Sequence, residues 1–182
     1  MRTQITPSAV VGFWKDAGPG KWFAKDAAFD AEFRRRFEDA HFMAARRELD
    51  HWAETAEGSL ALLILLDQFP RNVFRDTGHA FATDPLARHF AVMALDEGLD
   101  QRVEAPLRTF FYLPFQHHED LASQERILPY FQALPRAAND RWAEHHHDVI
   151  ARFGRFPHRN RALGRETTPE KQAFMDGDGF KG

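Results

Sequence analysis

Two short segments of the chain place a Phe-Pro step just before arginine and asparagine, and both are rich in side chains that can hold an anion. The first is DQFPRN, residues 67–72, and the second is FGRFPHRN, residues 153–160. Guanidinium groups form paired, charge-assisted hydrogen bonds with carboxylates and phosphates. The segments therefore predict a site for a phosphate- or carboxylate-bearing small molecule, and the cations around the second segment are Arg152, Arg155, His158, Arg159, Arg161 and Arg165.

The first segment contains a proline directly after an apolar helical run. A proline within a helix removes a backbone hydrogen bond and collides with the carbonyl group four residues earlier. We therefore expect Pro70 to break or kink the helix, with Phe69 in extended geometry. A helix that resumes at Pro70 would place Arg71 and Arg75 on one face, one turn apart. Because two guanidinium groups at that spacing repel each other, an acid or a bound anion is expected between them, and Asp67 is the nearest internal carboxylate.

The second segment lies at another predicted helix junction. Gly154 is expected to end one helix and Pro157 to begin the next. The free N–H groups at the start of such a helix favour a phosphate or carboxylate. A structural interpretation of both segments stays open. In it, Phe69 and Phe156 fill the core, and the arginines fasten helix ends by pairing with Asp67, Asp84, Glu119 or Glu166.

Histidine and carboxylate residues cluster in QHHEDLASQE and EHHHD. These residue types bind zinc, iron and manganese, but adjacent residues of a helix point about 100° apart, and no His-Glu-x-x-His pattern is present. We predict no metal and no cofactor, and we assign His146 to the core. A histidine beside a carboxylate is suited to proton transfer near neutral pH, which makes His118, His158 and Glu119 the candidate catalytic residues.

The segments that must position these residues have apolar residues at the spacing that is typical of helices. One apolar stripe is formed by Phe29, Phe33, Phe37, Ala40 and Ala44. A second helix is predicted from Asp84 as N-cap, with Pro85 in its first turn, to about Gly98, and its buried face is expected to include Met93. The apolar run 60–66 is assigned to a helix because it is rich in leucine and alanine. No hairpin signal appears, so an all-α fold of antiparallel helices in layers is predicted, with its second half divided by prolines 106, 114, 129, 135, 157 and 169.

The length, composition and net charge of the chain limit the classes of function that we expect. The 182 residues fit a single helical domain, with a core over about 6–175 and a disordered tail at 176–182. The net charge of −3 gives no field that would favour nucleic acid or a membrane surface, and neither is expected as a partner. The absence of cysteine excludes disulfides and thiolate chemistry. No secretory signal or membrane-length apolar run is visible, so a soluble, cytoplasmic protein is expected.

Four motifs in this order carry a family resemblance: LLDQFPRNVFR, AFATDPLARHFA, YLPFQHHEDLASQE and RFGRFPHRNRALGRETTPEK. The chain resembles the bacterial family called domain of unknown function 924, from about Val10 to Met175. The resemblance implies an all-helical fold similar to tetratricopeptide-type helical hairpins, and no established activity. Within the motifs, the predicted ligand-binding residues are Asp67, Gln68, Arg71, Asn72, Arg75, Gln124, Arg152, Arg155, Arg159, Asn160 and Arg165.

Three functions are compatible with the sequence. In the first, the arginines hold an anionic small molecule, and His118 or His158 moves a proton with Glu119. In the second, the helices form a scaffold for a protein or peptide partner, as helical-hairpin folds often do. In the third, the polar motifs only specify helix packing. Whether the protein is an enzyme stays open between them.

Overall fold

The computed structural model describes residues 5–135 and 142–177, and among these residues every regular element is helical. The predicted all-α fold is confirmed, while the tetratricopeptide-type arrangement stays a prediction. Three-ten turns and one π turn join the α-helices. The helices are α1 (Pro7–Ala17), α2 (Pro19–Trp22), α3 (Ala27–Ala45), α4 (Ala56–Leu63), α5 (Phe69–Val73), α6 (Asp84–Asp96), α7 (Thr109–Gln116), α8 (Leu121–Gln132), α9 (Trp142–Phe153) and α10 (Pro169–Asp176).

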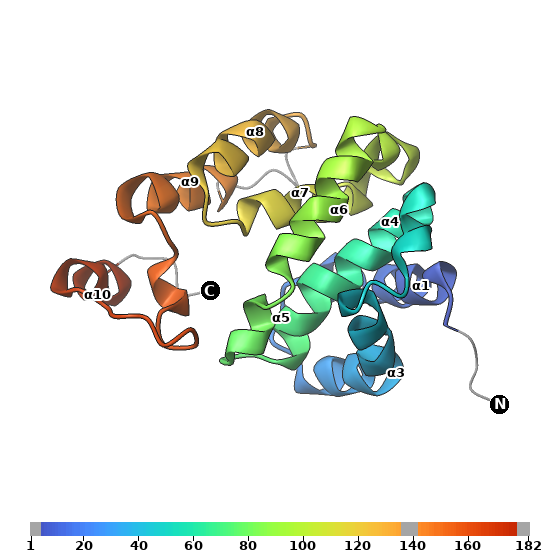
Figure 1. Cartoon of the computed structure of the whole chain (residues 1–182), viewed down its shortest axis with the longest axis horizontal. Coiled ribbons are helices and arrows are strands. Elements are labelled where there is room, and N and C mark those ends of the chain that lie inside the picture. Colours follow the sequence, from blue (N-terminus) through green and yellow to red (C-terminus); the bar gives the residue numbers. More distant parts are fainter. Residues whose placement is uncertain (1–4, 136–141, 178–182) are drawn as a thin grey trace.

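The short helix α4 lies at the centre and packs against α1, α6 and α7. Its residues from Gly58 to Leu63 are all buried. A side chain at Gly58 would overlap with the backbone carbonyl of Trp52, so glycine allows this close approach. Figure 1 shows α1 and α3–α6 gathered on one side and α8–α10 on the other, with α7 between them. The apolar stripe predicted for α3 faces the core, and its five members are buried: Phe29, Phe33, Phe37, Ala40 and Ala44.

Helix α6 follows its local sequence signals closely. It has Pro85 in its first turn, and Gly98 follows it in the left-handed conformation with φ 63°. Two details of the prediction are wrong. Thr83 occupies the N-cap position and Asp84 begins the helix, which leaves the Asp84 carboxylate available to other partners. Met93 is 44% exposed, because the buried face is centred on small residues that allow close packing: Ala87, Ala91 and Ala94, with Phe90.

Prolines divide the second half less than expected. Pro114 and Pro129 lie inside α7 and α8 instead of between helices. The fixed φ of proline is compatible with a helix, so each position loses a backbone hydrogen bond without ending its element. The helix that Gly154 was expected to end is α9, which is described from Trp142 to Phe153.

The junction at Pro70 is a π turn, and the predicted extended geometry of Phe69 is wrong. Residues Ile64–Gln68 form this π turn between α4 and α5, and Phe69 is helical with φ −53° and ψ −52°. The Phe69 N–H donates to the carbonyl oxygen of Ile64, five residues earlier. The wider turn lets the chain continue helically through Pro70.

The π turn leaves carbonyl groups that an α-helix would have used. The oxygen of Leu65 accepts from Nδ1 of His41 at 2.8 Å. The oxygen of Leu66 would need an N–H from Pro70, which has none, and it accepts from Oγ1 of Thr83 at 2.5 Å. Side chains from α3 and from the start of α6 therefore complete the hydrogen bonding of this turn.

At the C-terminal end, α10 closes at Asp176, and Gly177 follows it. The rest of the predicted disordered tail, residues 178–182, lies outside the described residues. Within 5–135 and 142–177, none of the helices combines the length and the apolar character of a membrane span.

Candidate functional site

The π turn places Asp67 inside the protein, where it is 1% exposed. Its Oδ1 atom accepts from Nδ1 of His117 at 2.8 Å and lies 3.1 Å from Nη1 of Arg71. Its Oδ2 atom accepts from the amide of Gln68 at 2.6 Å. Burial opposes ionisation, but the charge of Arg71 and the contact with His117 outweigh it and lower the pKa of Asp67 to about 2. Because the carboxylate is ionised, the His117 Nδ1 atom must be the donor.

Asp84 connects the two Phe-Pro segments. Arg71, from the first segment, donates from both Nη atoms to the two carboxylate oxygens at 2.7 and 2.9 Å. Arg159, from the second segment, donates from Nη1 to Oδ2 at 3.0 Å. The Nη2 atom of Arg159 also donates to the backbone oxygen of His117 at 2.9 Å. Two helix junctions that are far apart in the sequence thus meet at one carboxylate.

The guanidinium of Arg159 is held between two aromatic rings. Its Cζ atom lies 4.5 Å from the ring centre of Phe81 and 4.6 Å from that of Phe156, at cation–π distance. The side chain is buried, and its Nε atom has no hydrogen-bond partner among the described residues. Burial, followed by the charge of Arg71, lowers its pKa to about 10, which still leaves it protonated at neutral pH. Arg159 is therefore a fixed cation with one nitrogen, Nε, that has no partner among the described residues.

Glu119 occupies the place expected for an anion at the second junction. Its Oε1 atom accepts from the Phe156 backbone N–H at 2.8 Å, and Arg165 donates from Nη1 to both carboxylate oxygens at 2.8 and 2.7 Å. The predicted helix at Pro157 is only a three-ten turn of three residues, Pro157–Arg159. The protein's own carboxylate thus satisfies the backbone at this junction.

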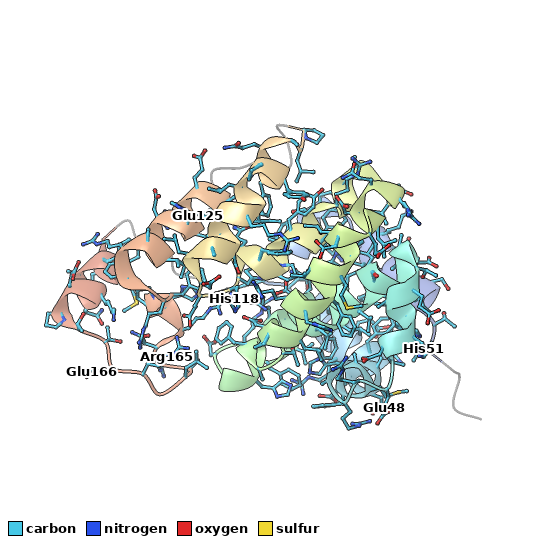
Figure 2. The ribbon with its side chains drawn as sticks, turned by 45° about the horizontal axis from the view of Figure 1, so that its top comes forward. Glu48, His51, His118, Glu125, Arg165 and Glu166 are labelled. Atoms are coloured by element: carbon cyan, nitrogen blue, oxygen red, sulfur yellow. The ribbon has the colours of Figure 1, made fainter. Side chains whose placement is uncertain are left out.

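A cleft of about 250 Å³ opens beside this network. In Figure 2, His118 and Arg165 come from separate segments and lie toward the same side of the molecule, whereas Glu48 and His51 lie at the other end. The volume is that of a small metabolite rather than a large cofactor. The cleft is lined by Gly78, Phe81, Ala82, Asp84, Pro85, His117, His118, Glu119, Arg159, Leu163 and Arg165.

Comparisons with known proteins give a family and one related structure. A family model described as "Bacterial protein of unknown function (DUF924)" matches residues 10–179. The chain belongs to this family. The solved structure of a protein of unknown function, ATU0120 from Agrobacterium tumefaciens, is 59% identical in sequence, with a TM-score of 0.90 over 93% of this chain and 96% of that chain. No curated protein matches the chain.

The histidine that contacts the buried Asp67 in this DUF924 protein is His117, which the sequence pattern did not select, whereas His118 lies 3.9 Å from Asp120. His118, its neighbour, lines the cleft, and its Nδ1 atom is 3.2 Å from Oγ of Ser123. Burial, followed by the charge of Arg88, lowers the pKa of His118. His158 is half-buried beside the ring of Phe156, and burial lowers its pKa to about 3. No local signal distinguishes His117 from His118, because only the tertiary contact with Asp67 does so.

Two predicted ligand-binding residues, one in the first segment and one three residues beyond it, contact α3 instead of the cleft. The amide of Asn72 donates to Oδ1 of Asp30 at 2.8 Å, and Arg75 pairs with Oδ2 of the same residue at 3.0 Å. Arg75 is not one helical turn beyond Arg71, because α5 ends at Val73. The predicted anion between the two arginines is therefore replaced by a separate carboxylate for each.

Of four other predicted ligand-binding residues, three form contacts within the protein away from the cleft, and one forms no hydrogen bond or ion pair with the described residues. The amide of Gln124 donates to backbone oxygens at the end of α7, including that of Gln116 at 2.7 Å. The amide of Asn160 donates into the following loop. Arg152 pairs with Glu170 on the surface at 3.0 Å, and Arg155 makes no hydrogen bond or ion pair with the described residues.

The part of the chain that the structure describes contains no group of three or more His, Asp or Glu side chains placed to hold a metal ion. The side chains that line the cleft offer guanidinium donors, carboxylate acceptors and imidazole nitrogens.

Proposed function

We propose that the cleft binds a small molecule through an anionic group, a carboxylate or a phosphate, with Arg159 as the main contact. The observation that carries this proposal is the unpartnered Nε atom of Arg159, a buried cation that lines the cleft. A buried donor without a partner costs about 1–3 kcal/mol, and a ligand oxygen would recover that free energy. Arg165 lines the same cleft and adds a second positive charge.

The charges around the cleft support an anion over a cation. Arg71 pairs with both Asp67 and Asp84, whereas Arg159 pairs only with Asp84 and shares it with Arg71. Helix fastening alone explains the ion pairs, but it does not explain why a buried Nε donor of a residue that lines the cleft has no partner. The rings of Phe81 and Phe156 fix the guanidinium before binding, which reduces the conformational entropy that a ligand must overcome.

The proposal is tested by thermal unfolding of the wild-type chain with acetate or inorganic phosphate, at constant ionic strength with chloride as the reference anion. An anion at ten times its Kd stabilises the folded state by about 1.4 kcal/mol. For a chain of this length, that corresponds to a rise in Tm of roughly 3–6 °C. Titration calorimetry then gives the affinity directly.

Two arginine variants distinguish anion binding at the cleft from anion binding elsewhere on the surface. Arg159→Gln should lose the anion effect and still fold, because Asp84 keeps its bidentate contact with Arg71. Arg152→Gln is the matched control, since Arg152 pairs with Glu170 on the surface and should leave the anion effect unchanged. The proposal is wrong if no carboxylate or phosphate compound stabilises the wild type, or if Arg159→Gln binds anions as well as the wild type does.

A further inference from the structure

His117 lines the cleft, and its imidazole has one nitrogen without a hydrogen-bond partner among the described residues. Its Nδ1 atom donates to the ionised carboxylate of Asp67, and the ring is neutral because burial, followed by the charge of Arg71, lowers its pKa despite the nearby acid. In a neutral imidazole whose Nδ1 carries the proton, Nε2 is an acceptor. Among the described residues this Nε2 atom has no hydrogen-bond partner, and His117 lines the cleft.

Arg159, the cation of the cleft, contacts the backbone of His117. The Nη2 atom of Arg159 donates to the backbone oxygen of His117 at 2.9 Å, so the guanidinium lies against the residue that carries the imidazole. Both side chains are fixed, Arg159 by two aromatic rings and His117 by Asp67. A ligand that satisfies both must have an anionic group beside a hydrogen-bond donor.

We infer that the cleft selects small hydroxy acids, whose carboxylate contacts Arg159 and whose hydroxyl donates to Nε2 of His117. The inference rests on the proposed function and adds the chemical class of the ligand. An acid with an apolar substituent in place of the hydroxyl would leave Nε2 without a donor, and a site built to bind a hydroxyl discriminates against such an analogue.

A hydroxyl fits the site better than an ammonium group does. The guanidinium groups of Arg159 and Arg165 belong to residues that line the cleft, and they repel a second cation. The carboxylates that could attract an ammonium, Asp84 and Glu119, already accept from these arginines. A neutral hydroxyl donor is not repelled by the guanidinium groups.

The test compares matched pairs of acids by titration calorimetry on the full chain: glycolate against acetate, and lactate against propionate. A hydrogen bond that one member of each pair lacks should make the hydroxy acid bind about tenfold more tightly. Glycine supplies the ammonium case and should bind no better than acetate.

A histidine variant assigns the preference to one nitrogen. In His117→Gln the amide N–H₂ can still donate to Asp67, but the Nε2 acceptor is removed, so the ratio of the glycolate and acetate affinities should fall to about one. His89→Gln, on the exposed face of α6, is the matched control and should keep the wild-type ratio. If His117→Gln does not fold, the nitrogen NMR signals of wild-type His117 decide, since glycolate should shift the Nε2 signal and acetate should not.

The outcomes separate this inference from the proposed function. Equal affinities for glycolate and acetate, or tighter binding of glycine, would overturn the hydroxy-acid inference and leave anion binding intact. Binding of neither acid would refute both. A tenfold preference for the hydroxy acid that persists in His117→Gln would show that another group accepts the hydrogen bond from the hydroxyl, and the assignment to His117 would be wrong.

Discussion

Asp84 is the carboxylate on which the two Phe-Pro segments depend, and Asp84→Asn tests that dependence. The carboxylate accepts three charge-assisted hydrogen bonds, two from Arg71 and one from Arg159. Removal of one partner from a buried ion pair costs about 3–5 kcal/mol. We expect a loss of about 3 kcal/mol, at the lower end, because Arg71 keeps Asp67 at 3.1 Å and the new amide oxygen still accepts one bond. The corresponding drop in Tm is roughly 6–12 °C.

A double-mutant cycle isolates the contact between Asp84 and Arg159. In the background of Asp84→Asn, the further change Arg159→Gln removes a buried cation that has lost its carboxylate, so it should cost little. We expect a coupling free energy of about 2 kcal/mol, measured by urea unfolding of the four proteins at neutral pH with circular dichroism. The exposed pair of Asp96 and Arg126, at 2.7 Å, gives the control cycle and should couple by less than about 0.5 kcal/mol. A coupling no larger than that of the control would refute the central role of Asp84.

Two further predictions concern pH and the π turn. Burial lowers the pKa of His41 to about 4 and those of His146 and His158 to about 3. Below about pH 6.5 the unfolded chain therefore takes up protons that the folded chain does not, and the free energy of unfolding decreases as the pH is lowered. Together these three histidines should remove roughly 3 kcal/mol of unfolding free energy between pH 6 and pH 5, and a flat stability profile from chemical unfolding would contradict the assignment. Thr83→Val should cost about 1–3 kcal/mol in thermal unfolding because it leaves the Leu66 carbonyl without its donor, whereas Thr77→Val, which removes an exposed hydroxyl contact, should cost less; equal losses would argue against the role of the π turn.

Local signals were enough to predict the helices. Pro85 and Gly98 bracket α6, and the spacing of phenylalanines in α3 gives its buried face. Each of these signals acts within a few residues and needs no distant partner. The π turn could not be predicted in this way, because its open carbonyl groups are satisfied by His41 and Thr83, which are distant in sequence.

The candidate site was predicted in its composition but not in its pairing. Arg71 and Arg159 were selected from their segments, and the structure brings both to Asp84. Arg75 was placed with them by assuming a regular helix, and the end of α5 at Val73 separates it from the cleft. The choice between His117 and His118 depends on which ring faces Asp67, and a rotation of about 100° between adjacent residues separates the two.

The π turn at Ile64–Gln68 also makes the length of this segment critical. Each residue of an α-helix advances the chain by about 100° around its axis. The π turn takes up one residue more than an α turn, so deletion of one residue here would restore a regular helix and leave Arg71 in register, but it would move Asp67 away from His117. A codon gained here would rotate Arg71 away from Asp84 and misalign the two halves of the protein, whereas a codon lost would be taken up by the π turn.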